Sequence, residues 1–272
     1  MPILGIDYEK CNNCQICYYV CTGYFRRDKE LNKIVFEDPN NLCDLCGRCI
    51  AMCKLDAILY ENVGDVLTFE EVQDPYTLIP YETMHKFMSA KRSIRGFKKK
   101  KVPKALLEKV LDAMKYAPTG GNIRTLQCTI ISDDDKIKRL SELVMDRIIA
   151  SNNPRYSEYM RKARERGIDS IFYNAPHVMI IHSSNPGDGM NSTIALTYGM
   201  LYAQTLGLGT CWIGLAHGVL SKSTPWSLEA RKKIAGIDGF VWGVIIIGYP
   251  TQIYYRVPPR PDIKTKGLNE LE

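Results

Sequence analysis

The chain has 272 residues, of which 45% are hydrophobic, so it can bury a sizeable core and is expected to form one large domain or a large domain with a small one. The N-terminal segment MPILGIDYEK has no basic region followed by an apolar run, and no stretch reaches the roughly 18 apolar residues of a membrane span, so we predict a cytoplasmic protein without a membrane partner. The formal net charge is +6, and after residue 60 the chain has 29 Lys and Arg against 22 Asp and Glu, but no motif supports nucleic acid as a partner.

The first feature along the chain is a pair of cysteine-rich segments. Each reads Cys-x-x-Cys-x-x-Cys-x-x-x-Cys, and the second repeats the first at an offset of 32 residues, giving Cys11, Cys14, Cys17 and Cys21, then Cys43, Cys46, Cys49 and Cys53. Eight thiols in the first fifth of a long chain without an export signal favour metal ligation over a disulfide framework.

This spacing predicts two iron–sulfur clusters. Three thiolates at two-residue gaps can wrap one cubane while the fourth cysteine reaches across to the other cubane. We therefore expect one cluster on Cys11, Cys14, Cys17 and Cys53, and the other on Cys43, Cys46, Cys49 and Cys21. Two structural zinc sites are the alternative, which the third closely spaced cysteine of each set disfavours. Over about residues 3–60 the pattern resembles the bacterial two-cluster ferredoxin domain, which implies two 4Fe-4S clusters that move single electrons.

A connector and a helical region are expected next. Residues 61–83 contain Gly64, Pro75 and Pro80 among short apolar runs, and they are expected to join a first domain, residues 1–60, to a second domain, residues 84–272. A helix is predicted near residues 83–90. Pro103 suits the first turn of another helix, which Pro118 ends and whose apolar face repeats at helical spacing as Leu106, Leu107, Val110, Leu111 and Met114.

Around this second helix the chain resembles the nitroreductase superfamily of FMN-dependent oxidoreductases. The segment KRSIR, then VP, a helix and the loop APTGGNIR follow one another as the motifs of that family do. The resemblance implies that the FMN phosphate and ribityl chain are bound by Lys91, Arg92, Ser93 and Arg95, and guanidinium groups suit a dianionic phosphate. It also implies that the flavin ring is contacted from the partner subunit by Pro118, Thr119, Gly120, Asn122 and Arg124. The lysines of residues 98–101 are expected to be solvated.

The remaining pattern extends this resemblance to about residue 261. Residues 126–132, 177–183 and 240–250 are predicted to be buried strands, and residues 155–166 a charged helix. A mostly apolar helix from Asn191 or Ser192 to Gly207 must be buried on most sides, and it is similar to the family's central helix at the dimer interface. The resemblance makes the next strand, with Ile213, Gly214 and Leu215, face the flavin, and it makes Arg256 or Arg260 a further phosphate ligand.

Together these features predict an α+β protein: a small two-cluster ferredoxin domain followed by a nitroreductase-like FMN domain with a mixed sheet flanked by helices, assembled as a homodimer. Electrons are expected to enter through the two 4Fe-4S clusters and reduce FMN, which then reduces an electron-poor small molecule such as a nitroaromatic, a quinone or an activated alkene in a ping-pong reaction. Ferredoxin, another low-potential donor or NAD(P)H would supply the electrons.

Two alternatives to this function remain open from the sequence. One is another flavin reduction, such as reductive dehalogenation, and the other is a non-enzymatic electron-transfer module between protein partners. A pocket ringed by apolar and aromatic residues would favour an enzyme. No catalytic side chain is named, because the flavin is the reacting group in the family that the chain resembles.

Overall fold

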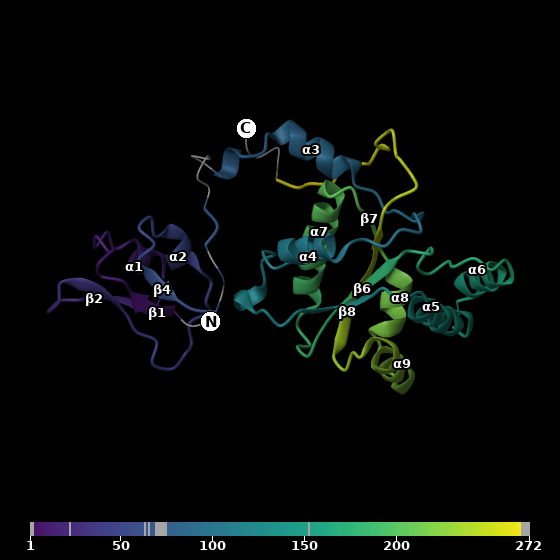
Figure 1. The fold of residues 1–272 in the computed structure, drawn as a ribbon, viewed down its shortest axis with the longest axis horizontal. Helices are drawn as coiled ribbons and strands as arrows, with labels where there is room; N and C mark the ends of the chain where they lie inside the picture. The colour runs from purple at the N-terminus through teal and green to yellow at the C-terminus, as the bar shows by residue number, and fades with distance from the viewer. Residues whose placement is uncertain are drawn as a thin grey trace. The chain divides into compact units, whose positions relative to one another are not determined.

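The computed structural model describes residues 3–21, 23–62, 64, 66–68, 75–151 and 153–267 (Figure 1). The chain separates into two compact units. The first comprises Met1–Leu78 together with Pro118–Arg124, and the second comprises Ile79–Ala117 together with Thr125–Glu272. The segment Pro118–Arg124 therefore belongs to the first unit, although the chain on both sides of it belongs to the second.

The first unit contains the same β-α-β order twice. Its elements are β1 (Ile3–Ile6), α1 (Ile16–Val20), β2 (Phe25–Asp28), β3 (Lys33–Phe36), α2 (Arg48–Met52) and β4 (Ile58–Tyr60), followed by the short 3-10 helices η1 (Pro75–Thr77) and η2 (Gly120–Asn122). Strand β1 pairs antiparallel with β4, and β2 pairs antiparallel with β3. Because the first and last strands pair, the two halves close on one small core of Ile3, Ile6, Phe25, Ile34, Ala57 and Ile58.

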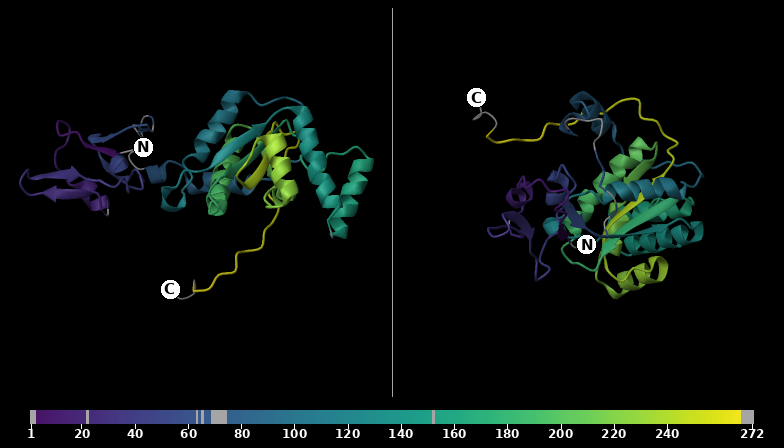
Figure 2. Two further views of the ribbon diagram at one scale, coloured as in Figure 1. Left: turned by 90° about the horizontal axis from the view of Figure 1, so that it is seen from below. Right: turned by 60° about the vertical axis from the view of Figure 1, so that its left-hand side comes forward.

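The second unit is a sheet covered by helices on both faces (Figures 1 and 2). Its elements are α3 (Tyr81–Ala90), α4 (Lys104–Met114), β5 (Gln127–Ile131), α5 (Asp134–Ile149), α6 (Pro154–Glu165), β6 (His177–Ser183), α7 (Gly189–Thr205), β7 (Gly209–Trp212), α8 (Gly214–Leu220), α9 (Pro225–Ala235) and β8 (Phe240–Gly248). The strand order is β5-β6-β8-β7. The α+β class expected from the sequence is confirmed.

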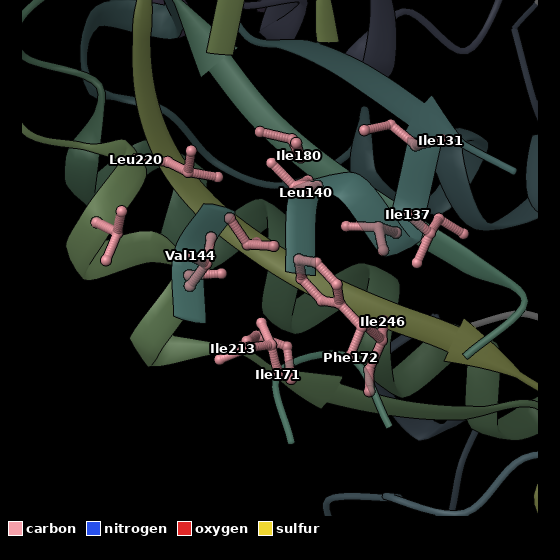
Figure 3. Close-up of a cluster of buried hydrophobic side chains, with 14 of the residues drawn as sticks. Ile131, Ile137, Leu140, Val144, Ile171, Phe172, Ile180, Ile213, Leu220 and Ile246 are labelled. Carbon is pink, nitrogen blue, oxygen red and sulfur yellow. The ribbon is translucent and has the colours of Figure 1, made fainter. Parts of the chain in front are cut away.

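The central strands β6 and β8 send alternate side chains into two separate cores. Val178, Ile180 and Ile246 pack with α5 and α8 in one core, which Figure 3 shows in close-up. Met179 and Ile245 pack on the opposite face with α4 and α7. Every residue of β6 is buried, which explains why its centre, residues 178–181, is a continuous apolar run and not an alternating one.

The structure corrects two expectations about the second unit. Each strand pairing of the four-stranded sheet in the described residues is antiparallel, whereas a mixed sheet was expected. Strands β5 and β6 are joined in the chain by two helices, α5 and α6, and a connection between antiparallel neighbours needs no crossover from one end of the sheet to the other. In addition, Gly214 and Leu215 begin helix α8, whereas a strand was expected there.

Local sequence sets several helix ends. Asp133 caps α5 by accepting from the backbone N–H of Lys136, and α6 begins with Asn153 as cap and Pro154 in its first turn. The charged helix expected over residues 155–166 is thereby confirmed as α6. Among the helices of the described residues, none combines the length and the hydrophobicity that crossing a lipid bilayer requires.

His177 predicts a pH dependence of stability in the second unit. Burial, followed by the nearby charge of Lys101, lowers the pKa of His177 to about 4, and its ring accepts a hydrogen bond from the backbone N–H of Val102 at 2.9 Å. The unfolded chain takes up this proton near its ordinary pKa of about 6.5, so the free energy of unfolding should fall as the pH falls from about 6.5 to about 4.

The measurement is urea unfolding of wild type and His177→Gln at several pH values. The wild type should lose up to about 1.4 kcal/mol per pH unit more than the variant within that window, and the two should have the same slope above pH 7. Equal slopes of the two proteins below pH 6 would contradict the assignment.

Candidate functional site

Four cysteines of the first unit surround one cavity. The cavity has a volume of about 230 Å³ and is lined by Cys11, Cys14, Cys17 and Cys53 together with apolar side chains from β1, β3 and β4. Backbone N–H groups donate to two of these sulfurs, from Asn13 to Cys11 at 3.4 Å and from Ala57 to Cys53 at 3.2 Å. Burial raises the pKa of Cys17, and the negative charges of Cys11 and Cys14 raise it further. These four residues are the set that the sequence assigns to the first cluster.

The other four cysteines of the repeats are Cys21, Cys43, Cys46 and Cys49, and their charges also affect one another's pKa values. Burial raises the pKa of Cys49 to about 11, and the charges of Cys21, Cys43 and Cys46 add to this effect. Cys46 differs, because a hydrogen bond from the backbone of Arg48, assisted by its guanidinium group, lowers the pKa of that thiol. Cys21, from the first repeat, is thus electrostatically coupled to the cysteines of the second repeat.

The two cysteine loops share one backbone conformation. Asn13 and Leu45 are equivalent at the offset of 32 residues, and both have left-handed φ values, 59° and 53°. Gln15 and Gly47 are also equivalent, with φ values of 65° and 74°. Left-handed residues in such turns direct successive backbone N–H groups toward one side, which creates a favourable surrounding for negative charge.

No group of three or more His, Cys, Asp or Glu side chains in the described ranges converges closely enough to hold a single metal ion. A zinc ion draws its sulfur ligands to about 2.3 Å, whereas a cluster of four irons and four sulfides spreads its cysteine ligands around a larger body. A cluster site therefore holds its sulfur ligands farther apart than a single zinc ion does.

The segment Pro118–Arg124 lies with the second cysteine loop. The side-chain amide of Asn122 donates to the backbone carbonyls of Asp44 at 2.9 Å and of Leu45 at 2.7 Å. Gly121 and Asn122 have left-handed φ values of 58° and 52°. The predicted flavin-contact residues Pro118, Thr119, Gly120, Asn122 and Arg124 are thus grouped with the cysteines of their own chain; contact with a partner's flavin stays a prediction.

The second unit has a cavity of about 340 Å³ where β7 leads into α8. It is lined by Arg95, Tyr156, Ser170, Ile171, Tyr173, Cys211, Trp212, Ile213, Gly214 and Leu215. Four of the predicted cofactor residues are among them, namely Arg95, Ile213, Gly214 and Leu215. The cavity combines one cation, three aromatic side chains and the backbone of the β7–α8 junction, a composition typical of a small-molecule site.

Three cationic residues, Lys91, Arg92 and Arg95, lie in one short segment of the chain, and Arg95 lines the cavity. Burial lowers the pKa of Lys91, and the nearby charge of Cys211, a cavity residue, acts in the opposite direction. The guanidinium of Arg95 lies 5.8 Å from the ring centroid of Tyr173, and that of Arg92 lies 5.9 Å from that of Tyr254. Within the part of the chain that the structure describes, Lys91, Arg92 and Arg95 form no ion pair with a carboxylate.

The backbone of residues 91–95 is fixed against β7. The N–H of Ile94 donates to the carbonyl of Thr210 at 3.0 Å. Gly209 permits this close approach, because a Cβ atom there would lie 2.7 Å from the Ile94 side chain. Ser93 is exposed on the same segment, and the exposed Arg256 and Arg260 are absent from the described lining of the cavity.

Several cavity residues were not predicted from the sequence. Tyr156, Ser170 and Ile171 carry no motif, whereas Tyr173 is a candidate pocket residue from the sequence but only one of sixteen tyrosines. Tyr173 and Asn174 have consecutive left-handed φ values of 55° and 53°, which is uncommon for a non-glycine pair and typical of strained functional sites. The sequence does not reveal this strain, because it arises from the packing around the turn.

Comparison with known proteins identifies the family that the sequence motifs resemble. The sequence model of the nitroreductase family matches residues 88–249, more than half of the chain. Iodotyrosine deiodinase 1 of Rattus norvegicus is 20% identical over 199 residues, which cover 70% of this chain and 68% of that protein.

Solved structures share the fold. A nitroreductase with bound FMN from Bacteroides fragilis NCTC 9343 has a TM-score of 0.55 at 23% identity, covering 69% of this chain and 98% of its own. A nitroreductase with bound FMN from Desulfitobacterium hafniense DCB-2 has a TM-score of 0.53 at 18% identity, covering 65% of this chain and 93% of its own.

The contact of Ile94 with Gly209 predicts a stability effect. Gly209→Ala would push Ile94 and the cationic segment away from β7, so we expect a loss of about 1–3 kcal/mol in the free energy of unfolding. The matched control is Gly218→Ala in α8, where an added Cβ meets nothing within 4 Å and should be neutral or stabilising by up to about 1 kcal/mol. Urea unfolding followed by circular dichroism compares the two, and equal stabilities would show that the close approach is unimportant.

Proposed function

The chain belongs to the nitroreductase family, and we propose that it is a flavin oxidoreductase that binds FMN and carries two 4Fe-4S clusters in its N-terminal unit. The observation that carries the flavin proposal is the cavity at the junction of β7 and α8, which unites Arg95 with the backbone of Ile213, Gly214 and Leu215. The two FMN-bound nitroreductases named above, which share this fold, support the choice of FMN.

The residues present fit FMN chemically. A phosphate is dianionic, and Lys91, Arg92 and Arg95 are cations without a carboxylate partner in the described residues, so they would neutralise it. Tyr156, Tyr173 and Trp212 give the cavity aromatic walls against which a flat acceptor can stack. A cavity of this kind supports an enzyme over a module that only passes electrons between proteins.

The residues of the first unit also fit two clusters. One set of four thiols surrounds a single cavity, and the thiols of the other set are coupled through their charges. Backbone N–H groups donate to Cys11 and Cys53, as the negative charge of a thiolate-bound cluster requires. We therefore assign Cys11, Cys14, Cys17 and Cys53 to one cluster and Cys21, Cys43, Cys46 and Cys49 to the other.

When bound, the clusters would carry single electrons and the flavin would hold two, so that together they would reduce an electron-poor acceptor such as a nitroaromatic, a quinone or an activated alkene. Ferredoxin or another low-potential donor would supply the electrons, with NAD(P)H as the other candidate. The protein residues would bind and orient the reactants, and we assign no catalytic side chain. Free thiols in this number suit a reducing compartment, so we propose a cytoplasmic location.

We further propose that the protein is a homodimer. Helix α7 is apolar around most of its circumference, yet Met190, Tyr198 and Tyr202 are exposed in the single chain, Met190 by 76%. Exposed apolar side chains gathered on one helix are typical of a protein–protein interface. A second copy packed on α7 would cover them.

Reductive dehalogenation is the second candidate reaction. The similarity to iodotyrosine deiodinase 1 favours it, although at 20% identity. The aromatic walls of the cavity would suit a halogenated phenol as well as a nitroaromatic. Supplying 3-iodotyrosine and a nitroaromatic in parallel assays with the same reductant distinguishes the two candidates by the product released.

The proposed phosphate site predicts a selective loss of flavin. In Arg92→Ala/Arg95→Ala, removal of two charge-assisted contacts should weaken FMN binding by at least tenfold while iron content stays unchanged. Absorbance after gel filtration and iron analysis measure both. Arg139→Ala, on the exposed side of α5, serves as the control and should retain FMN. Full flavin occupancy in the double variant would rule out the phosphate assignment.

The proposed role of the clusters predicts how the flavin is reduced. In an anaerobic titration with reduced ferredoxin, Cys46→Ala should contain fewer irons and show at least tenfold slower bleaching of the flavin absorbance than wild type. Cys128→Ala, in β5, is the control and should match wild type. Unaltered bleaching in Cys46→Ala would contradict electron entry through the clusters, and faster bleaching of the wild type by NADPH would identify NADPH as the donor.

A further inference from the structure

The two cysteine loops present the same peptide group to a sulfur. In the first loop the N–H of Asn13 donates to Cys11 at 3.4 Å. In the second loop Leu45, the residue equivalent to Asn13, has a matching left-handed φ, 53° against 59°, so its N–H is directed to the same side of its loop, toward Cys43. These N–H groups belong to the Asn12–Asn13 peptide in the first loop and to the equivalent Asp44–Leu45 peptide in the second.

The carbonyl ends of these two peptides have different surroundings. The carbonyl of Asp44 belongs to the same peptide as the N–H of Leu45, and it accepts from the Asn122 amide at 2.9 Å. In the first loop the side chain of Asn13 donates to the carbonyl of Asn32 at 3.1 Å, and the hydrogen bonds of the described residues include no side-chain donor to the carbonyl of Asn12.

A peptide bonded at both ends is a stronger donor. The C=O and N–H of a trans peptide point in opposite directions, so the Asp44–Leu45 peptide accepts from Asn122 on one side and directs its N–H toward Cys43 on the other. Hydrogen bonds in such a chain polarise one another and strengthen each bond. Asn122 also donates to the next carbonyl, that of Leu45, at 2.7 Å, and Arg124 approaches its Oδ1 atom at 3.5 Å, which fixes the amide orientation.

We infer that Asn122 is a positioning residue that raises the reduction potential of the second cluster, held by Cys21, Cys43, Cys46 and Cys49, relative to the first. This inference rests on the proposed function, since it requires clusters on both cysteine sets. Reduction adds negative charge to a cluster, and hydrogen bonds to its sulfurs stabilise that charge and raise the potential. The segment Pro118–Arg124 thereby serves the iron–sulfur site of its own chain.

The test is a redox titration of the purified holoprotein followed by EPR, which gives the midpoint potential of each cluster separately. Asn122→Gly removes the amide and keeps the left-handed backbone without strain, since φ at Asn122 is 52°. Asn122→Asp keeps the shape and removes both N–H donors.

Asn62→Gly is the control, because Asn62 is exposed, has a φ of 62° and lies outside both cysteine loops. Cys46→Ala, which should retain the first cluster, assigns the signals.

Both Asn122 variants should shift the midpoint potential of the second cluster to more negative values. The midpoint potential of the first cluster and the flavin content should stay unchanged in both variants. The Asn62→Gly protein should have the potentials of wild type. Unshifted potentials in both variants, or equal shifts of the two clusters, would overturn the inference and leave the proposed function intact. Loss of iron in Asn122→Gly with an unshifted potential in Asn122→Asp would also overturn it, since Asn122 would then act only in folding. Absence of cluster signals from the wild-type protein after iron–sulfur reconstitution would instead overturn the proposed function.

Discussion

The burial of β6 and β8 on both faces is the constraint on which the second unit depends. Two strands without a solvent-facing side need a helical layer above and below, and the chain provides α4 and α7 for one face and α5 and α8 for the other. Gly243 in β8 shows how tight this packing is, because a Cβ atom there would lie 2.3 Å from the Leu196 side chain of α7. Such a sheet gives β7, at its edge, a fixed position from which the cavity is built.

The cavity follows from where β7 ends. The strand stops at Trp212, Ile213 precedes α8, and the cationic segment of residues 91–95 is bonded to Thr210. A rigid sheet edge therefore brings together a cation-rich segment and the backbone of a strand–helix junction that lie about 120 residues apart in the sequence. Positioning by a scaffold of this kind is what a bound cofactor needs, since small displacements of its contacts weaken binding and orientation.

The first unit faces a different physical problem. Its core is small, and burial, together with the charges of neighbouring cysteines, makes thiolates costly there, as the raised pKa values of Cys17, Cys43 and Cys49 indicate. Donation from backbone N–H groups reduces this cost, and left-handed residues at equivalent positions of both loops supply it. The strain of these residues is tolerated because each half of the repeat is fixed by its pairing with the other half.

Much of this architecture could be predicted from the sequence. Spacing alone grouped the cysteines into two repeats, and periodicity located α4, α6, β6 and β8, because these features depend on neighbours in sequence. The order of short motifs pointed to the family and to Arg95, Ile213, Gly214 and Leu215, which line the cavity.

Only the tertiary structure decided the rest. Tyr156, Ser170 and Ile171 join the cavity through packing between distant elements, and α8 replaces an expected strand with Ala216, Val219 and Leu220 buried in the core. The same holds for the bonds that the Asn122 amide donates to the loop of Cys43 and Cys46, which its motif did not reveal. The sequence by itself determined which residues are candidates for the chemistry, and folding determined their neighbours, because a hydrogen bond across 77 positions depends on how the intervening chain packs.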